Sequence, residues 1–296
     1  MVKSKKHAAF VVTKPIQLLV ALAILEQEVF YQDVTLIFCD SFVDAQNVED
    51  RFKRAFKGRI RSNFCKNRIH AINFAANQGF DFLYLDSDVG VQHYIALLGF
   101  KLRSPFCSVN VFEEGLGTYN EDSYTGVKKF ILKALGVGGN FGGNVFVSRI
   151  FLYDPDEYIA KFYQQREKVI LIKTSIWNSI DINRKRLTKT FNIINHSDSA
   201  NRRKVCYIYM TAHHVDYDFL TQFKKDDGQL FIKYHPHLYN SLQVEGVQVL
   251  NSSAPIECII YEFLCIYDNV VVYDHHSAAR RYVFDPRVSF KSIHEL

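Results

Sequence analysis

Residues 7–26, HAAFVVTKPIQLLVALAILE, decide the fold class of this chain. A short apolar run, 7–12, has the length and composition of a buried strand. Thr13 and Pro15 follow it, and such residues are typical of a helix N-cap and of the first turn of a helix. A helix carrying Gln17 to Glu26 is therefore expected next. A strand followed by a helix is the repeating unit of parallel sheets covered by helices.

The same alternation of short apolar runs and helix-length amphipathic runs continues along the chain. In the first half it predicts strands at about 8–12, 34–39, 82–85 and 107–112, and helices at about 15–29, 43–56, 67–78 and 91–99. A polar stretch, 194–204, resembles a linker. Beyond it the alternation predicts strands at 205–210, 230–234, 247–250 and 269–273, and helices at 216–225 and 255–266. We therefore expect two Rossmann-like α/β domains, 1–198 and 199–296, facing each other across a cleft.

The composition is that of a globular protein, since 48% of the 296 residues are hydrophobic and 23% are charged. The net charge is +5, and the basic residues form three groups: Lys3, Lys5 and Lys6; Arg51, Lys53, Arg54, Lys57, Arg59 and Arg61; and Arg184, Lys185, Arg186 and Lys189. Such groups are either solvated helix faces or contacts for an anionic membrane surface or acceptor. No RNA-binding signature accompanies them, so a nucleic-acid partner is not expected.

The six cysteines include no CxxC pair, which favours reduced, buried thiols over disulfides or a zinc site. No run approaches the ~20 apolar residues of a membrane span. The Lys-rich start followed by LLVALAIL imitates a signal peptide, but Lys14 and Pro15 precede that run and no small-residue cleavage site follows it. We expect a cytoplasmic protein with peripheral contact at the inner face of the membrane.

Glu113 and Glu114 come directly after the strand expected at 107–112, and Gly115 and Gly117 follow them. Glycine allows a tight strand exit with close backbone approach. Two like charges held together disfavour double ionisation, so one of the carboxylates can serve as a general base. The alternative is an acidic surface turn without a catalytic role.

His235 and Pro236 follow the strand expected at 230–234. A histidine at the carboxyl end of a strand can donate a proton or a hydrogen bond to a phosphate, because imidazole titrates near neutral pH. The alternative is a histidine that caps a turn. His237 is interpreted as a solvated neighbour.

Three residues near the end of the chain are further candidates for donor binding. Glu257 begins the helix expected at 255–266, where it either caps the helix or accepts hydrogen bonds from a ribose diol. His276 and Ser277 follow the strand at 269–273, and a small hydroxyl at a helix N-terminus suits a phosphate. Adjacent histidines point apart and lack a spaced set of further ligands, so a metal site at His275 and His276 is not favoured.

Two further patterns carry little weight. Asp86 and Asp88 form a DxD pattern, by which one class of glycosyltransferase holds a divalent cation, but a strand-end aspartate is common in Rossmann sheets. The segment GVGGNFGGN, 136–144, follows a probable helix instead of a strand, so it lacks the context of a dinucleotide fingerprint. We interpret this segment as a mobile loop, an acceptor lid.

In this order, the motifs resemble those of the bacterial sialyltransferases of the two-domain GT-B type. Those enzymes carry a D/E-D/E-G motif, an HP motif and a late S-S/T motif, and the matching residues here are EEG at 113–115, HP at 235–236 and Ser277. The lipooligosaccharide sialyltransferase family, glycosyltransferase family 52, is particularly similar. The similar segments are VTKPIQ at 12–17, LYLDSDVGVQHYIAL at 83–97, VNVFEEGLGTYN at 109–120 and PIE at 255–257.

The resemblance implies an inverting sialyltransferase that needs no cofactor or metal. Glu114 would be the general base, with Glu113 beside it, and His235 would contact the phosphate and act as general acid. Ser277 would bind the phosphate and Glu257 the ribose; the remaining donor-side residues would be Pro236, His276, Thr13, Gln17 and Gly115. The late motif reads His276-Ser277, so its first hydroxyl is missing, and Ser252 and Ser253 lie before the position of the motif.

The implied partners are a CMP-sugar donor and a glycan acceptor, and a homodimer is expected. One alternative is a GT-B glycosyltransferase that uses CMP-Kdo or a UDP-hexose. Another is a non-catalytic protein that binds carbohydrate or serves as a scaffold.

Overall fold

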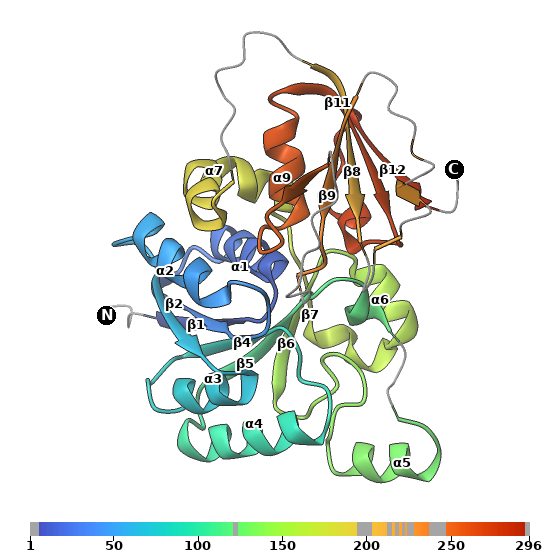
Figure 1. The fold of residues 1–296 in the computed structure, drawn as a ribbon. Coiled ribbons are helices and arrows are strands. Elements are labelled where there is room, and N and C mark those ends of the chain that lie inside the picture. The colour runs from blue at the N-terminus through green and yellow to red at the C-terminus, as the bar shows by residue number, and fades with distance from the viewer. Residues whose placement is uncertain are drawn as a thin grey trace. The chain divides into compact units, whose positions relative to one another are not determined.

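The computed structural model describes residues 6–120, 124–193, 203–211, 215–216, 219–220, 223, 228–236 and 247–293 (Figure 1). The chain divides into two compact units, 1–41 with 56–175, and 42–55 with 176–296. We call them the N-terminal and the C-terminal unit. Each contains one parallel β-sheet with helices, so the predicted α/β class with two Rossmann-like domains is confirmed.

The N-terminal unit has a seven-stranded sheet in the order β3-β2-β1-β4-β5-β6-β7, and all its neighbouring strands are parallel. Its strands are β1 Lys6–Val12, β2 Tyr31–Cys39, β3 Arg61–Cys65, β4 Phe82–Leu85, β5 Ser108–Phe112, β6 Val147–Leu152 and β7 Val169–Leu171. The four predicted strands correspond to β1, β2, β4 and β5. The other three were not predicted.

The helices of the N-terminal unit are α1 Pro15–Gln27, α3 Arg68–Ala75, α4 Val91–Arg103, α5 Gly126–Ala134 and α6 Pro155–Lys161, with 3-10 turns η1 Leu116–Tyr119 and η2 Tyr163–Lys168. Helix α1 is apolar on all sides, and its residues from Leu18 to Ile24 are at most 3% exposed. Leu97 and Phe100 of α4 pack in one cluster with Leu83 of β4 and Val109 of β5. These contacts form the core that supports the carboxyl ends of the central strands.

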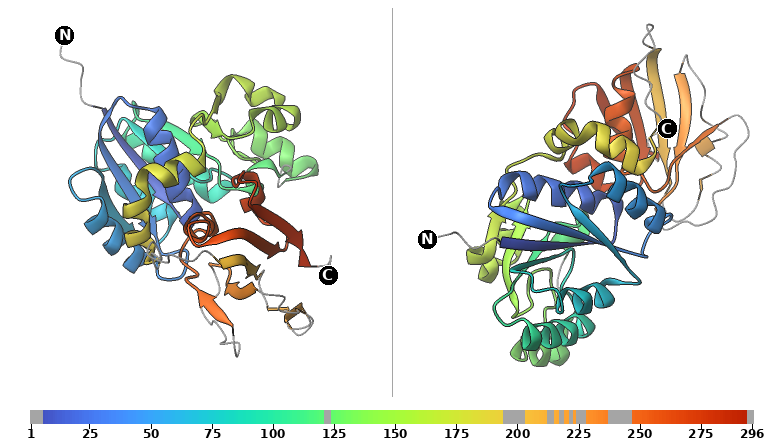
Figure 2. Two further views of the ribbon diagram at one scale, coloured as in Figure 1. Left: turned by 90° about the horizontal axis from the view of Figure 1, so that it is seen from above. Right: turned by 90° about the vertical axis from the view of Figure 1, so that its left-hand side faces the viewer.

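The C-terminal unit has a five-stranded parallel sheet in the order β10-β9-β8-β11-β12. Its strands are β8 Arg203–Met210, β9 Gly228–Lys233, β10 Gln248–Leu250, β11 Tyr267–Asp274 and β12 Val288–Ser292. Its helices are α2 Ala45–Ala55, α7 Ile176–Phe191 and α9 Ile256–Phe263, with the 3-10 turn η3 Ala278–Arg281. The four strands predicted for this half are present, and β12 is additional. Figure 2 shows both sheets from two further directions.

Helices α2 and α7 belong to the C-terminal unit. Arg51 of α2 donates from Nε to the carbonyl of Thr190 at 2.8 Å, and Arg184 of α7 donates to Glu262 of α9 at 2.8 Å. The predicted boundary at 198/199 therefore separates the two sheets. Helices α2 and α7 precede this boundary in the sequence but belong to the C-terminal unit. The predicted linker lies outside the described residues up to position 202, as does most of the helix expected at 216–225.

Among the described residues, no helix combines the length and the apolar character needed to cross a bilayer.

Candidate active site

The carboxyl ends of β1 and β4 form the switch point of the N-terminal sheet, because β1 pairs with β2 on one side and with β4 on the other. In open parallel sheets, ligands bind beyond the carboxyl ends of the strands at such a point. Thr13 follows β1 and Asp86 follows β4. Glu113 and Glu114 follow β5, the next strand along, so most of the predicted residues of the N-terminal half gather at one edge.

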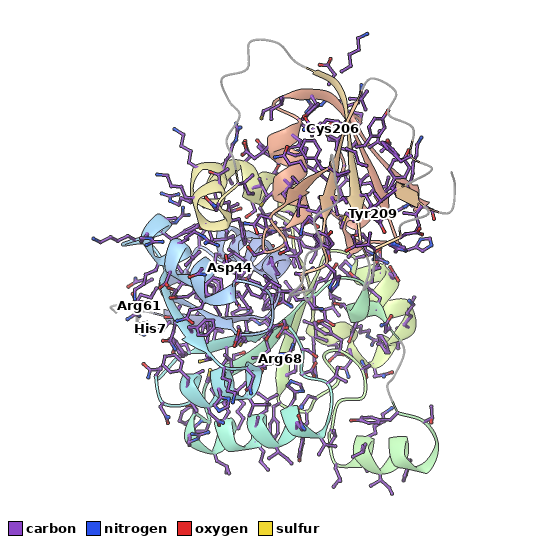
Figure 3. The ribbon with its side chains drawn as sticks, viewed as in Figure 1. His7, Asp44, Arg61, Arg68, Cys206 and Tyr209 are labelled. Atoms are coloured by element: carbon purple, nitrogen blue, oxygen red, sulfur yellow. The ribbon has the colours of Figure 1, made fainter. Side chains whose placement is uncertain are left out.

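Asp86 is the centre of a buried network at this edge. Its carboxylate is 0% exposed and accepts hydrogen bonds from Arg68 Nε at 2.6 Å, from Arg68 Nη2 at 2.5 Å, from Gln17 Nε2 at 2.9 Å and from the Thr13 hydroxyl. Burial disfavours the charged form, but the Arg68 guanidinium and the other donors outweigh it and hold the pKa of Asp86 below its usual range. Arg68, labelled in Figure 3, was not predicted.

Gln17 also fixes the turn between β1 and α1. Its Oε1 accepts from the backbone N–H of Thr13 at 2.6 Å and of Lys14 at 2.9 Å. The prediction that Thr13 is the N-cap is wrong, because the helix begins at Pro15 with Lys14 as N-cap. Thr13 is 5% exposed and Gln17 is 0% exposed, so the main role of both is to position Asp86 and the turn between β1 and α1.

Glu114 is the partly accessible acid of the predicted EEG motif. Its side chain is 20% exposed and its Oε2 lies 3.1 Å from Nζ of Lys14, which follows β1. Its backbone N–H donates to the hydroxyl of Thr118 at 2.9 Å. The carboxylate lies against Gly117, where a Cβ would come within 2.6 Å of Oε1. Gly115 has a φ of 115°, which residues with a side chain rarely adopt, so glycine at this position allows the backbone conformation of the turn.

Glu113 has a different environment. It is 1% exposed, and its Oε2 accepts from the Tyr119 hydroxyl at 2.5 Å and from the backbone N–H of Tyr153 at 2.8 Å. Successive residues at a strand end point to opposite faces. The two carboxylates therefore have separate partners, and the interpretation of Glu113 and Glu114 as a like-charge pair is not supported.

Asp88 anchors the glycine-rich segment 136–144. It is 0% exposed and accepts from the backbone N–H of Gly142 at 2.7 Å and of Asn144 at 2.9 Å. Burial raises the pKa of Asp88 to about 6, although these two hydrogen bonds act to lower it. Phe141 is 3% exposed and Asn144 is 0% exposed. The interpretation of this segment as a mobile loop is therefore wrong: it packs into the core of the unit.

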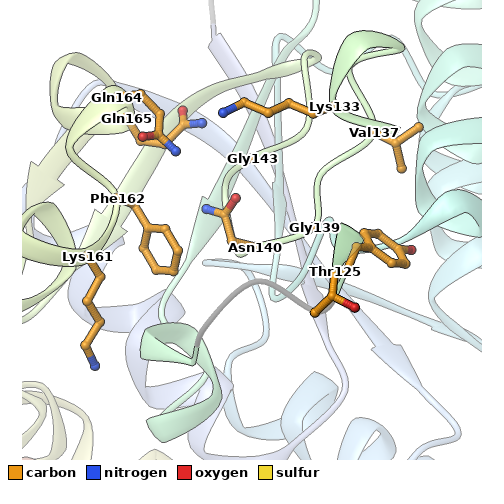
Figure 4. Close-up of a pocket in the computed structure, with 11 residues that line it drawn as sticks. Thr125, Lys133, Val137, Gly139, Asn140, Gly143, Lys161, Phe162, Gln164 and Gln165 are labelled. Atoms are coloured by element: carbon orange, nitrogen blue, oxygen red, sulfur yellow. The ribbon is translucent and has the colours of Figure 1, made fainter. Parts of the chain in front are cut away.

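A cavity of about 540 Å³ adjoins this segment (Figure 4). Its wall contains amide, lysine and aromatic side chains, among them those of Asn140, Gln164, Gln165, Lys161 and Phe162. Lys161 also donates from Nζ to the carbonyl of Tyr119 at 3.1 Å, at the end of the turn that follows the EEG motif. The cavity wall and the EEG turn are thus joined by a direct hydrogen bond.

In the C-terminal unit the switch point lies between β8 and β11. Thr211 follows β8, and its hydroxyl accepts from the backbone N–H of His235 at 3.1 Å. The Thr211 N–H donates to the carbonyl of Lys233 at 3.0 Å. His235 is partly buried, and the carbonyl of the following Pro236 accepts from the N–H of Val43 at 2.9 Å. His237 lies outside the described residues.

Glu257 lies in the first turn of α9, as predicted, but it is only 3% exposed. Burial raises its pKa to about 7, and the charge of Lys233 partly opposes this shift. Burial likewise lowers the pKa of Lys233 to about 8, and its Nζ donates to the carbonyl of Ser252 at 3.1 Å. Ser253 is 0% exposed, and its hydroxyl donates to Asn251 at 2.8 Å. Its buried hydroxyl is therefore a poor alternative for binding a phosphate.

Asp274 closes the turn that carries His276 and Ser277. It is 0% exposed and accepts from the N–H groups of His276 and Ser277, each at 3.2 Å, and from Arg280 Nη2 at 2.7 Å. The Ser277 hydroxyl accepts from the N–H of Ala279 at 3.2 Å. His276 is exposed, with a φ of 58°. Asp274, which was not predicted, therefore already accepts from the backbone N–H groups of His276 and Ser277 at the position expected to bind a phosphate.

Within the described ranges, no cluster of three or more His, Cys, Asp or Glu side chains is arranged to hold a metal ion. Asp86 and Asp88 each have their own protein donors, as described above.

Comparisons with known proteins identify the fold. No family model and no curated protein matches the chain. Solved structures match almost all of it. A protein of Listeria monocytogenes described as a UDP-N-acetylglucosamine 2-epimerase is 14% identical, with a TM-score of 0.53, over 91% of this chain and 75% of that one. The wall teichoic acid polymerase TagF is 13% identical, with a TM-score of 0.52, over 95% and 68%.

A third neighbour is the UDP-GlcNAc 2-epimerase of Methanocaldococcus jannaschii, which is 10% identical, with a TM-score of 0.50, over 97% of this chain and 89% of that one. These similarities agree with the two parallel-sheet units described above. The chain has a GT-B-like two-domain fold. At such low identity the similarity is one of fold alone.

Proposed function

We propose that this GT-B-like protein is an inverting, metal-independent sialyltransferase. It would move sialic acid from CMP-Neu5Ac to a hydroxyl, most simply of galactose, on a bacterial surface glycan such as lipooligosaccharide, O-antigen or capsule. The observation that carries the proposal is Glu114: a partly accessible carboxylate at a strand end, in a glycine turn, beside the switch point of its sheet. The identity of the donor, CMP-Neu5Ac, is inferred from the resemblance of the EEG, HP and late serine motifs to those of the bacterial sialyltransferases.

The proposed reaction is a single displacement. Glu114 accepts the proton of the acceptor hydroxyl, and the hydroxyl oxygen forms a bond with the anomeric carbon of the sugar. The bond between that carbon and the phosphate oxygen of CMP breaks, and His235 protonates or hydrogen-bonds the departing phosphate. Glu114 Oε2 lies 3.1 Å from Nζ of Lys14, and this contact supports the proposal by holding the carboxylate at the sheet edge where the first step needs a base.

The cavity of Figure 4 is proposed as the binding site of the acceptor glycan. Amide groups such as those of Gln164 and Gln165 can both donate to and accept from sugar hydroxyls. Phe162 offers an apolar surface to a sugar ring. The hydrogen bond from Lys161 to Tyr119 joins this wall to the EEG turn.

Two other functions remain candidates. A UDP-sugar donor is favoured by the neighbours named for UDP-GlcNAc, and CMP-Kdo would suit a CMP-specific site equally well. A non-catalytic carbohydrate-binding or scaffold protein is favoured by the closed turn at Asp274, which occupies two backbone N–H groups at the position expected to bind a phosphate.

Donor hydrolysis without acceptor tests these functions directly. The full chain would be incubated with CMP-Neu5Ac, CMP-Kdo and UDP-hexoses, each with excess EDTA and with Mn²⁺. We expect nucleotide release from CMP-Neu5Ac alone, at the same rate in both conditions. Release from another donor would replace the proposed substrate, and binding without any release would indicate a non-catalytic protein. Activity lost in EDTA and restored by Mn²⁺ would contradict the proposed metal-independent mechanism.

Glu257→Gln is expected to change the pH dependence of stability. Because the folded-state pKa of Glu257 is raised from 4.5 to about 7, its stabilising contribution is present below the unfolded value and is lost as the pH rises to about 7. The difference in unfolding free energy between wild type and variant should therefore fall between about pH 4.5 and 7, by up to roughly 3 kcal/mol. Chemical denaturation at several pH values measures this difference.

The same variant tests the proposed ribose contact. If Glu257 contacts the ribose, the KM for the CMP donor rises, since that contact is made in ground and transition states alike. A difference in stability that is constant with pH would contradict the raised pKa, and an unchanged KM would remove Glu257 from the donor site.

A further inference from the structure

Helices α4 and α5 each lie in a segment of the chain without acidic residues. Segments 89–112 and 124–153 contain no Asp or Glu, although the chain has 31 of them. Helix α4 ends with Lys101 and Arg103, and α5, GVKKFILKA, contains three lysines. Both helices lie at the same end of the N-terminal unit in Figure 1 and in the right-hand view of Figure 2.

Helix α4 has two opposite apolar faces. Leu97 and Phe100 are 0% exposed and pack in the core. On the other side Val91, Ile95, Leu98 and Leu102 are 41%, 63%, 40% and 78% exposed. At 3.6 residues per turn these four side chains fall within about 60° of one another around the helix. An apolar stripe with this spacing is typical of a helix face that contacts a partner.

Further exposed apolar side chains lie at the same end of the unit. Phe106, shortly after α4, is 98% exposed, Phe130 and Ile131 of α5 are 76% and 52% exposed, and Leu135, the C-cap of α5, is 59% exposed. We call these four residues, together with the four of the α4 stripe, the α4–α5 surface. Large exposed apolar side chains gathered on one side of a unit are typical of interaction sites in proteins.

We propose that the α4–α5 surface binds the surface of a membrane that contains anionic lipids. Its leucine, isoleucine and phenylalanine side chains would enter the boundary between headgroups and acyl chains, while Lys101, Arg103 and Lys133 contact the anionic headgroups. This surface is distinct from the basic groups that sequence analysis identified. The proposal does not depend on the sialyltransferase function.

Charge favours a lipid surface over a second copy of the chain. A symmetric contact through α4 and α5 would bring the basic residues of two copies together with no acidic residue on either helix to compensate them. An anionic bilayer instead supplies both the apolar phase and the opposite charge.

Vesicle co-sedimentation of the full chain tests the proposal. We expect binding to phosphatidylcholine vesicles containing phosphatidylglycerol, and binding weaker by about tenfold or more to phosphatidylcholine alone or at high salt. The combined variant Ile95→Ser, Leu102→Ser, Phe106→Ser and Phe130→Ser should bind at least about tenfold more weakly. The matched control is Val29→Ser with Phe284→Ser, which changes side chains that are 85% and 80% exposed outside the α4–α5 surface.

Thermal unfolding of both variants shows whether they fold. Equal vesicle binding by wild type and a folded combined variant would overturn the proposal. Equal binding of wild type to vesicles with and without phosphatidylglycerol would overturn it too. Light scattering without lipid tests the alternative, a contact between two copies of the chain. That alternative holds if wild type is a dimer that does not bind vesicles and the combined variant is a monomer.

Discussion

Glu114→Gln is expected to lower kcat by roughly 10²–10⁴-fold, the usual contribution of a general base. Glutamine keeps the shape of the side chain but cannot accept the proton of the acceptor hydroxyl. The contacts of Glu114 are with Lys14 and the EEG turn, so binding of CMP should persist. Steady-state kinetics with CMP-Neu5Ac and a galactoside acceptor measure the rate, and titration calorimetry measures CMP binding.

Glu113→Gln is the matched control for this prediction. Because Glu113 is buried and accepts from Tyr119 and Tyr153, we expect a lower melting temperature and a smaller loss of kcat. Normal turnover in Glu114→Gln together with loss of turnover in a folded Glu113→Gln would reverse the assignment. If neither substitution changes the rate, the EEG motif is only a turn.

His235→Ala provides an independent check on the other end of the proposed displacement. It should slow the natural CMP donor more than an artificial donor with a better leaving group, because the latter needs less protonation. Equal effects on both donors would show that His235 does not assist the leaving group.

The second large effect is expected on stability. Asp86 is 0% exposed, and Arg68→Ala removes the cation that pairs with its carboxylate; breaking a buried ion pair in this way costs about 3–5 kcal/mol. Denaturant unfolding measures this loss. Adding Asp86→Asn to Arg68→Ala should recover part of it, since the uncompensated charge is removed.

Lys14→Ala is the matched control, because it removes the cation from another carboxylate at the same edge of the sheet. Lys14 and Glu114 have side chains that are 37% and 20% exposed, so water can replace the lost partner. We expect a loss of at most about 1 kcal/mol. Similar losses in both variants would contradict the difference in burial on which the prediction depends.

Most of the predicted strands, such as β1, β2 and β4, are buried along most of their length and form continuous apolar runs. Four residues of β3, RSNFC, are only partly buried, and β12, VSFKS, alternates between partly buried and exposed side chains. Neither forms an apolar run. Helix α7 was missed because its basic residues suggested a solvated face, although Ile176, Ile180, Leu187 and Phe191 are buried.

The residues of the candidate site likewise divide into those that the sequence could predict and those that it could not. Residues directly after strands, such as Glu114, could be found because a strand end in a parallel sheet is a defined place. Asp86 also stands at a strand end, but it was set aside as part of a weak DxD pattern. Arg68 comes from a helix and meets Asp86 only through the tertiary fold, so local spacing carried no signal for it. Asp274 is a strand-end carboxylate and could have been found by the rule that identified Glu114.

The anchoring of segment 136–144 by Asp88 has a consequence for how the adjoining cavity recognises its ligand. The two hydrogen bonds to Gly142 and Asn144 restrict this wall when the protein folds, so the conformational entropy of the segment is lost before a ligand arrives. Binding then need not order the wall, which favours affinity through preorganisation. Discrimination between glycans would depend on how well each one fits a shape that already exists.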